Sequence, residues 1–485
     1  MQKKVTDYGI YRWRYAIGYT LVVLTVVSAI LFAGLFTPGE LRSEEQISAV
    51  NSSNLSIKNL APSMVVNLPY HMLQKSVFSI FGVSTFTIKL PSIILALITV
   101  VGVFLLFRIW FKRNVAVIAT VTIATTTQFL FLSQDGTPAI LFSALTVWLL
   151  FSATQATRDC KHFNTFWKVL ACVLLAVILY VPLGVYVVVA LLIASLFHPH
   201  TRYIIKHIPK LRLLLAAILG AATLLPLIYA SIVDPAVAKQ LLGIPTTPIN
   251  FLDNLAAVGT IILGAPHESL GYLVRPLYSF GVVALMGIGL FSLFTHRYTA
   301  RSYTLFLIGI PLVLLPLINP SVLIFVFPFA AILSAIGLAW LINYWYSLFP
   351  RNPYARITGL VPLVIIVTGI MMLSVMRYND NYQYNPTILA YYSSDLSLLN
   401  NTLAQKAPER ITLIVDNSEK EFYQTVAKYN KQLTIETSVE NGTRDTFIAT
   451  RSYKNHHTLP TPSVVITSDR IQDANRFYIY NSTTK

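Results

Sequence analysis

Long apolar segments separated by short polar stretches make up most of the chain before residue 377. They lie at about 15–36, 87–108, 114–132, 137–154, 166–180, 183–197, 211–230, 276–295, 302–318, 321–345 and 357–376. A helix that crosses a membrane needs about 20 apolar residues, because the hydrocarbon layer of a bilayer is about 30 Å thick. The pattern therefore predicts a mostly α-helical, polytopic membrane protein with about 11 transmembrane helices.

The fifth and sixth apolar segments form one long run that is interrupted by "YVPLGVY". Pro182 and Gly184 in this stretch either turn the chain within the bilayer or kink a single helix, which gives eleven or ten spans. With eleven spans and a cytoplasmic N-terminus, nearly all the excess of basic residues lies on the cytoplasmic side, as the positive-inside rule requires. Eleven is therefore the preferred count.

This topology predicts that two long loops, 37–86 and 231–275, and the C-terminal tail are extracytoplasmic. Residues 1–376 would form the transmembrane domain and residues 377–485 a separate extracytoplasmic domain. Hydrophobic residues make up 55% of the chain and charged residues only 12%, which is about half the charged fraction of a soluble domain. Topology and attraction to anionic membrane lipid explain the net charge of +16, so it does not indicate nucleic-acid binding.

The C-terminal tail has the pattern of a small α/β domain. Short strands are predicted at "RITLIVD", "QLTIET", "TFIAT", "SVVITS" and "RFYIYN", and a helix at "SEKEFYQTVAKY". Ser418 and Glu421 occupy the positions of a capping box at the start of this helix. Because the tail contains no nucleophile elbow, glycine-rich phosphate loop or metal-binding motif, we interpret it as a lid or docking domain.

Acidic residues are scarce in the helical part, yet three of them follow the first apolar segment in "GELRSEEQIS". Glu40, Glu44 and Glu45 lie at the predicted outer edge of the membrane, and Asp135 in "FLSQDGTP" reaches the same side. A structural role is one explanation, because carboxylates near helix N-termini are favoured by the helix dipole alone. The motifs around them favour a catalytic role.

Four motifs occur in a fixed order in this part of the chain. They are the pair Glu44-Glu45, the stretch "PYHMLQKSVFSIFG", the sequence "KLPS" at 89–92 and the sequence "SQD" at 133–135. Together they resemble the polyprenyl-phosphate-dependent glycosyltransferases of the GT-C type, which include protein O-mannosyltransferases and the aminoarabinose transferase that acts on lipid A. The resemblance covers about residues 15–155.

Some positions depart from that family pattern. Thr137 and Ala139 stand where the family often has arginine and tyrosine, and "INPSVLIFVFPF" lacks the Arg-Tyr pair that is common in the tenth helix. A cation for the donor phosphate must then come from another segment. Arg275 in "GYLVRPLYSFG" resembles a family position and is the candidate.

The resemblance implies transfer of a sugar from a polyprenyl-phosphate donor to a hydroxyl acceptor on a protein, a lipid or a cell-envelope glycan. Such a reaction needs a base for the acceptor hydroxyl and positive charge at the leaving phosphate. The base would be Glu44 or Glu45, and Asp135 would hold the base, the acceptor or a metal. The residues expected to bind the donor phosphate are Lys75, Arg275, Tyr70, His71 and His267. A divalent metal cation that bridges a carboxylate and the phosphate stays an open option.

Two other functions are compatible with the sequence. A transporter or flippase for a lipid-linked substrate is also polytopic, but such proteins have broken helices in two corresponding halves, and the break at Pro182 has no counterpart. A non-catalytic scaffold of the GT-C type would explain the missing arginine and tyrosine. Single residues also have structural explanations: Lys75 can extend to lipid headgroups, Arg275 can anchor a helix end and His267 can lie in a polar loop.

Overall fold

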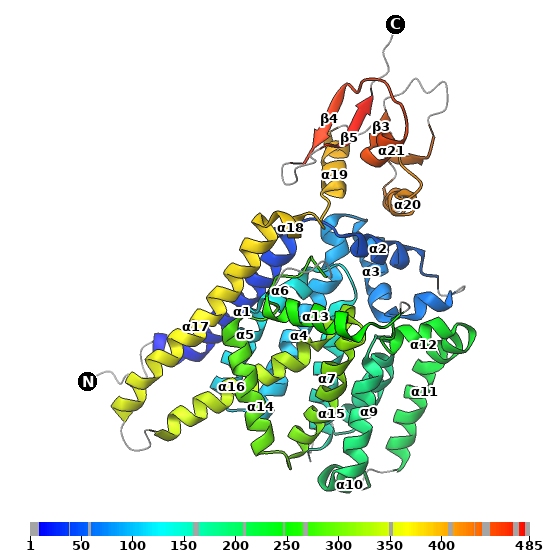
Figure 1. Cartoon of the computed structure of the whole chain (residues 1–485). Helices are drawn as coiled ribbons and strands as arrows, with labels where there is room; N and C mark the ends of the chain where they lie inside the picture. The colour runs from blue at the N-terminus through cyan, green and yellow to red at the C-terminus, as the bar shows by residue number, and fades with distance from the viewer. Residues whose placement is uncertain are drawn as a thin grey trace.

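The computed structural model describes the chain apart from residues 1–8, 38, 57–59, 159–163, 207–209, 246–247, 265–269, 349–352, 406–410, 431, 439–446, 469–474 and 481–485. The helices form one large bundle, and a small domain of strands and helices sits at one end of it (Figure 1). We call the end of the bundle that carries this domain the domain end.

Helices account for nearly all of the bundle. After α1 (Gly9–Leu35) come three short elements, α2 (Ser43–Asn54), η2 (Pro62–Val65) and α3 (Leu68–Phe81). The next elements are α4 (Thr85–Trp110), α5 (Arg113–Ala124), α6 (Thr127–Gln134), α7 (Ala139–Ala156), α8 (Asn164–Val177), η3 (Ile178–Tyr180), α9 (Gly184–Phe197), α10 (Pro199–Lys206) and α11 (Lys210–Val233). The last are α12 (Pro235–Leu241), α13 (Phe251–Leu263), α14 (Phe280–Thr295), α15 (Ala300–Leu314), η4 (Leu315–Leu317), η5 (Pro320–Val326), α16 (Phe327–Leu348), α17 (Pro353–Tyr384) and α18 (Pro386–Leu389).

The predicted class, a mostly α-helical polytopic membrane protein, is confirmed, but with fewer full-length spans than the eleven predicted. Among the described residues, six helices are long and apolar enough to cross a membrane, or up to eight if each bent pair counts as one span. Helices α8 and α9 have 14 residues each and α14 has 16. At about 1.5 Å per residue they are about 21–24 Å long, shorter than the hydrocarbon layer of about 30 Å.

One predicted span is broken in the structure, and the predicted division of the chain at "YVPLGVY" is confirmed. The segment predicted at 114–132 consists of α5 and α6, which are bent by 64°. The run around "YVPLGVY" forms two separate helices, α8 and α9, with the 3-10 turn η3 between them. Leu183 adopts a positive φ of 65° immediately before α9. The interruption therefore ends one helix and starts another, instead of kinking a single helix.

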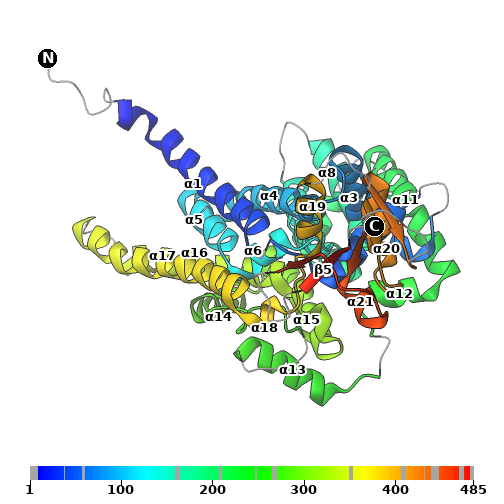
Figure 2. The same cartoon turned by 90° about the horizontal axis from the view of Figure 1, so that it is seen from above.

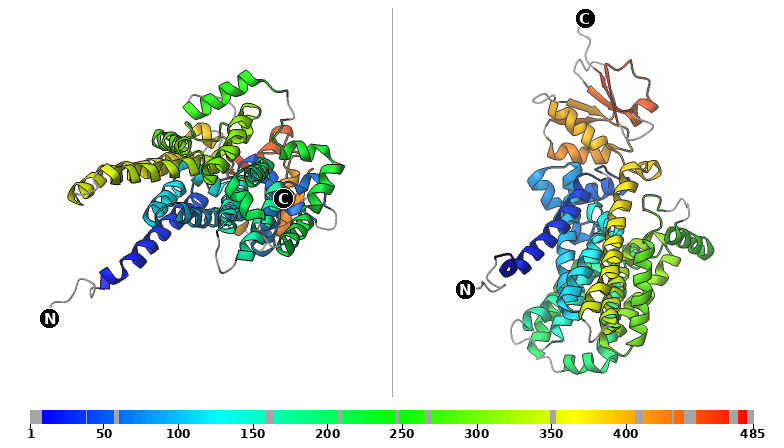
Figure 3. Two further views of the ribbon diagram at one scale, coloured as in Figure 1. Left: turned by 90° about the horizontal axis from the view of Figure 1, so that it is seen from below. Right: turned by 90° about the vertical axis from the view of Figure 1, so that its left-hand side faces the viewer.

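Lipid-facing surface is most evident on α1 and α17, which extend from the same side of the bundle (Figures 2 and 3). Large apolar side chains on these helices are exposed, including Leu21 at 60% and Ile365 at 65%. Helix α16, by contrast, lies in the core and packs closely on α14. A Cβ atom at Gly289 or Gly337 would lie about 2 Å from a carbonyl oxygen of the facing helix. Glycine at these two positions therefore allows the backbones of the two helices to meet, as in other membrane helix pairs.

The C-terminal domain contains a five-stranded sheet with the order β2-β1-β3-β5-β4. Its strands are β1 (Ile411–Ile414), β2 (Leu433–Glu436), β3 (Phe447–Thr450), β4 (Val464–Thr467) and β5 (Asn475–Tyr480), and its helices are α19 (Asp395–Gln405), α20 (Lys420–Tyr429) and α21 (Arg451–His456). Strand β1 is parallel to β2 and β3, with Leu413 opposite Ile435 and Ile448, whereas β5 is antiparallel to β3 and β4. All five predicted strands and the predicted helix are confirmed.

The predicted capping box at the start of α20 is wrong. The helix begins at Lys420, with Glu419 in the N-cap position. The Ser418 hydroxyl donates instead to Asp416 Oδ2 at 2.7 Å. Aspartate and serine favour such local turns directly after a strand, and this turn competes with helix capping.

The C-terminal domain is joined to the bundle by more than its connecting helix. Helix α17 continues to Tyr384, so the predicted boundary at residue 376 falls inside it, because the polar sequence "RYNDNYQY" extends the helix past the apolar segment. Leu41 and Ser393 form an antiparallel β-bridge between the start of the first loop and the start of the domain. Ala49 of α2 and Phe78 of α3 belong to the same hydrophobic cluster as the sheet and α20. The first loop and the domain therefore share one core.

Candidate active site

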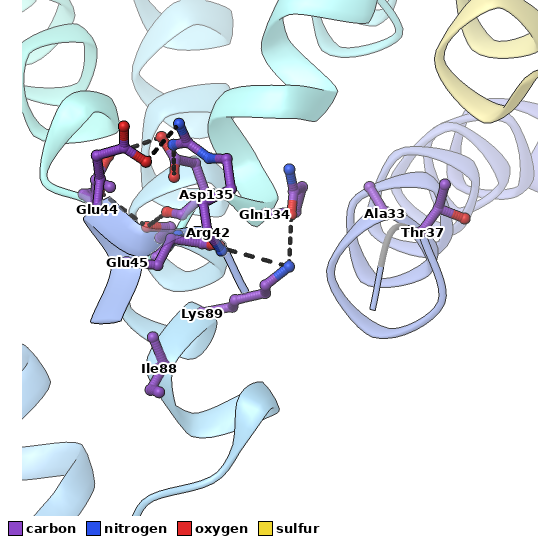
Figure 4. A network of polar contacts seen from close by, with 12 residues as sticks. Ala33, Thr37, Arg42, Glu44, Glu45, Ile88, Lys89, Gln134 and Asp135 are labelled. Carbon is purple, nitrogen blue, oxygen red and sulfur yellow. Dashed lines mark hydrogen bonds and ion pairs between the residues drawn. The ribbon is translucent and has the colours of Figure 1, made fainter. Parts of the chain in front are cut away.

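Glu44, Glu45 and Asp135, the three predicted catalytic carboxylates, lie together at the domain end (Figure 4). Glu45, in the first turn of α2, is fully buried and accepts two backbone hydrogen bonds. Its Oε2 accepts from the N–H of Arg42 at 2.7 Å, and its Oε1 accepts from the N–H of Gly136 at 2.6 Å. A glutamate at the third position of a helix commonly reaches back to the N-cap in this way. Glu45 thereby ties the start of α2 to the turn that follows α6.

Asp135 lies directly after α6 and is 1% exposed. Its Oδ2 accepts a hydrogen bond from the Thr137 hydroxyl at 2.7 Å, and its Oδ1 accepts one from Arg42 Nη2, also at 2.7 Å. The backbone of Asp135 is held as well, because the Ser92 hydroxyl of α4 donates to its carbonyl oxygen. The carboxylate is therefore fixed by neighbours from three segments.

Arg42 occupies the centre of the site, although no role was predicted for it. Its guanidinium bonds to Asp135 and lies 3.3 Å from Glu44 Oε2. The same group stacks on Tyr272, with the guanidinium carbon 3.9 Å from the ring centroid. Arg42 is only 3% exposed, so these contacts replace its hydration. The only sequence signal was its position among the acids of "GELRSEEQIS".

A second buried cation, Lys89 of α4, lies beneath Glu45. Its Nζ donates to Gln134 Oε1 at 2.8 Å and is 4.0 Å from Glu45 Oε1 (Figure 4). Burial raises the pKa of Glu45, and the Lys89 ammonium opposes this shift, while the Asp135 charge adds to it. In the sequence, Lys89 was recognised only as part of the "KLPS" motif and was not predicted to belong to the site.

Glu44 differs from its neighbour because its side chain is 56% exposed. Its carboxylate contacts Arg42 at 3.3 Å and the Ser43 hydroxyl at 3.4 Å. Glu45 is held by two backbone donors and has no exposed surface, whereas Glu44 can be reached by a substrate. Of the two candidate bases, Glu44 therefore has the accessible geometry.

Three of the predicted phosphate ligands make contacts away from Glu44. The Tyr70 hydroxyl bonds to Ser92 Oγ at 2.9 Å, and thus supports Asp135 indirectly. His71 Nδ1 bonds to the Ser52 hydroxyl at 2.7 Å on the buried side of α2, where burial lowers the pKa of His71 to about 4. Lys75 Nζ donates to the Leu55 carbonyl oxygen at the end of α2. In this structure these side chains hold α2 and α3 in place.

Arg275 lies in the same loop as Tyr272, the residue that stacks on Arg42. The Tyr272 ring also contacts Tyr391, with ring centroids 6.3 Å apart. Arg275 lies three residues after Tyr272, so the loop brings a further cation to the domain end. His267, the remaining predicted phosphate ligand, lies outside the described residues.

Among the described residues, a guanidinium lies where a cation bridging Glu44 and Asp135 would lie. Within the ranges that the structure describes, no group of three or more His, Cys, Asp or Glu side chains could hold a metal ion. The Arg42 guanidinium lies between Glu44 and Asp135, at 3.3 and 2.7 Å. Its positive charge already takes the place that a cation bridging the two carboxylates would need.

Comparisons with known proteins agree with this geometry. Residues 69–226 match a protein-family model described as dolichyl-phosphate-mannose-protein mannosyltransferase. This segment runs from α3 into α11 and includes Lys89 and Asp135. No curated protein matches the chain by sequence comparison.

Several solved structures have the same fold. ArnT from Cupriavidus metallidurans, bound to undecaprenyl phosphate, matches with a TM-score of 0.57 at 10% identity, over 96% of this chain and 98% of that chain. The apo form of ArnT matches with a TM-score of 0.55 at 11% identity. The oligosaccharyltransferase of Archaeoglobus fulgidus, tethered with an acceptor peptide, matches with a TM-score of 0.52 at 11% identity, over 86% of this chain and 64% of that chain.

At these identities the solved structures establish the fold, and the family match adds an independent sequence signal. Both agree with the predicted resemblance to membrane glycosyltransferases of the GT-C type, and the family match covers residues 69–226 of this chain.

Proposed function

We propose that this chain moves a sugar from a polyprenyl-phosphate donor to a hydroxyl acceptor at the domain end, with Glu44 as the general base. The observation that carries the proposal is the convergence of Glu44, Arg42 and Asp135, in which Arg42 and Asp135 meet from positions 93 residues apart. ArnT, which has the same fold over nearly its whole length, has been solved with undecaprenyl phosphate bound. That ligand supports a donor of the same chemical class here.

Glu44 would take the proton of the acceptor hydroxyl as its oxygen attacks the anomeric carbon of the sugar. The bond between that carbon and the phosphate oxygen breaks in the same step, and the polyprenyl phosphate leaves with the electron pair. A phosphate is already a weak base, so the leaving group needs positive charge nearby, not a proton. One accessible carboxylate is therefore sufficient, in contrast to the pair of carboxyl groups that a glycosidase uses.

Arg42 would hold Glu44 in position and contribute positive charge at the site, while Asp135 fixes Arg42. Arg275 is proposed to meet the donor phosphate from the neighbouring loop. Because a guanidinium cannot be deprotonated in proteins, this charge is present over the whole working pH range.

We propose that the domain end faces away from the cytoplasm. Basic residues support this orientation: α10, which contains Arg202, lies at the end of the bundle opposite the C-terminal domain (Figure 1), and Lys168 and Arg301 line a cavity together with Thr201 of α10. The positive-inside rule places such residues on the cytoplasmic side. Alkaline phosphatase is active only outside the cytoplasm, so a fusion of this enzyme to the C-terminus should be active. A fusion that is expressed normally but inactive would show that the domain end faces the cytoplasm.

Complementation of a deletion strain tests the enzymatic proposal. Mass spectrometry of surface protein, lipid and glycan should find one sugar modification missing in the deletion, restored by the wild-type chain and not by Glu44→Gln. Glu421→Gln is the matched control, because Glu421 is also an exposed glutamate in the first turn of a helix but lies in the C-terminal domain. A deletion that loses no sugar refutes the function, and full restoration by Glu44→Gln refutes the assigned base.

A further inference from the structure

A polar cavity lies in the C-terminal domain, at the carboxyl ends of strands β1 and β3. It has a volume of about 260 Å³ and is lined by residues that include Asp395, Glu419, Tyr423, Thr450, Asn455 and Arg476. In the order β2-β1-β3, the chain goes from β1 to its neighbour on one side and then to its neighbour on the other side. In open α/β sheets, ligands bind in the crevice that such a reversal creates at the carboxyl ends of the strands.

Several buried atoms in this cavity have unused hydrogen-bonding capacity. Asp395 Oδ1, Glu419 Oε2 and Arg476 Nε are buried, and none has a hydrogen-bond partner within the part of the chain that the structure describes. Arg476 Nε and Asp395 Oδ1 are 3.5 Å apart, which is longer than the 2.7–3.2 Å of a good N–H···O hydrogen bond. A buried polar atom without a partner destabilises the folded state, so the cavity favours a ligand that supplies partners.

The charges of the cavity select a neutral ligand. Two carboxylates, Asp395 and Glu419, are balanced by two guanidinium groups, Arg451 and Arg476. The two carboxylates would repel a phosphate or carboxylate ligand, and the two guanidinium groups would repel a cation. A hydroxyl both donates and accepts, so vicinal hydroxyl groups satisfy carboxylate and guanidinium partners together. The nearly buried Tyr423 ring adds an apolar wall.

The cavity is connected to the transfer site through the polypeptide itself. Asp395 lies two residues after Ser393, which forms the β-bridge with Leu41. Gln46 of α2 also donates to the Ser393 hydroxyl, at 3.3 Å. Glu44 lies three residues after Leu41. A ligand in the cavity is therefore held by the segment around Ser393, which pairs with the turn that carries Arg42 and Glu44.

We propose that this cavity binds a neutral saccharide unit of the acceptor and thereby presents an acceptor hydroxyl to the transfer site. The assignment rests on the proposed function, because it takes the acceptor to be a glycan or glycolipid. The volume suits a single sugar ring, since it is below the about 300–1,000 Å³ of pockets for drug-sized ligands. Asp395, Glu419 and Arg476 are the residues assigned to its hydroxyl groups.

Saturation-transfer NMR on the full chain in lipid nanodiscs tests the proposal, with the methyl α-glycosides of glucose, galactose and mannose as probes. Glycoside detergents are avoided because they would compete. At least one probe should bind the wild-type chain, and Asp395→Asn and Glu419→Gln should each weaken its binding by about tenfold, which is the loss of one charged hydrogen bond. Asp416→Asn is the matched control, because Asp416 lies on the same edge of the sheet outside the cavity lining.

The outcomes separate this proposal from the proposed function. Glu44→Gln should keep the binding while losing transfer, so a chain that binds glycosides without any transfer activity refutes only the enzymatic proposal. Absence of binding by all three probes refutes the saccharide site, as does binding that is unchanged in folded Asp395→Asn and Glu419→Gln. A serine-containing peptide that binds in the cavity where the glycosides do not would also overturn it, in favour of a protein acceptor.

Discussion

Glu44 and Glu45 are adjacent in the chain, yet the same substitution should affect them in different ways. Glu44→Gln removes the proposed base from a side chain that is 56% exposed and whose one contact with a buried residue is the 3.3 Å approach to Arg42. A positioned general base contributes about 10²–10⁴-fold to a rate. We therefore expect the transfer rate to fall by about that factor, while the yield of folded protein and its melting temperature stay at the wild-type values.

Glu45→Gln should mainly lower stability. Glutamine has the same shape, but its amide nitrogen cannot accept from the backbone N–H of Arg42 or Gly136, so one hydrogen bond to a charged acceptor is lost, worth about 1.5–3 kcal/mol. The substitution also leaves the buried Lys89 without its carboxylate. Breaking a buried ion pair costs about 3–5 kcal/mol. We expect a loss within that range, accompanied by a lower melting temperature.

The assay compares single-turnover transfer rates and tryptophan-fluorescence melting curves for the two variants in nanodiscs. The expected pattern is slow transfer with normal stability for Glu44→Gln, and reduced stability for Glu45→Gln, with a smaller loss of rate in the fraction that stays folded. The reverse pattern would show that the reasoning is wrong. A Glu45→Gln chain with wild-type stability and no transfer would identify Glu45 as the base. The assignment of Glu44 from its exposure would then be wrong.

Three further outcomes follow from the site. Because Arg42 already supplies positive charge between the carboxylates, transfer should survive dialysis against EDTA, and a loss that Mg²⁺ or Mn²⁺ restores would contradict this role of Arg42. Burial lowers the pKa of His71 to about 4, so between pH 6.5 and pH 4 the unfolded chain binds a proton at this side chain and the folded chain does not. The free energy of unfolding should therefore fall by up to about 3 kcal/mol over that range. Urea unfolding should show this loss in the wild-type chain and not in His71→Gln. Gly136→Ala places a Cβ 2.8 Å from Ile88 Cγ2 and 3.1 Å from Glu45 Oε1, so the variant should melt at a lower temperature and transfer more slowly, whereas Gly259→Ala, which has open space around it, should resemble the wild type.

The secondary structure could be predicted from local patterns. Apolar runs marked the long helices of the bundle but not the short helices α2, α3, α10, α12 and α13, and short alternating stretches marked all five strands of the C-terminal domain. The number of spans could not be predicted in the same way. An apolar run indicates that a segment contacts lipid or the protein core, but it does not indicate where each helix ends. Breaks such as the one after Ala124, where α5 ends and α6 starts at Thr127, divide a continuous apolar run into shorter helices.

The candidate site was predictable only in part. The carboxylates were found because each stands out in an apolar chain and belongs to a short motif. Arg42 was missed because its partners, Asp135 and Tyr272, are far away in the sequence, and no periodic pattern encodes such contacts. Lys89 was seen as one letter of a motif, but its role depends on Gln134 and Glu45 approaching from other segments.

The β-bridge between Leu41 and Ser393 limits how this protein can be re-engineered. A chimaera that exchanges only the sequence after residue 385 would bring in a foreign edge for Leu41 and a foreign surface for α2, and would disturb the turn that carries Arg42 and Glu44. Transplanting the tail together with residues 39–81 moves both halves of the shared core as one module. Diversification of the acceptor among relatives should accordingly proceed by paired changes in these two stretches of chain.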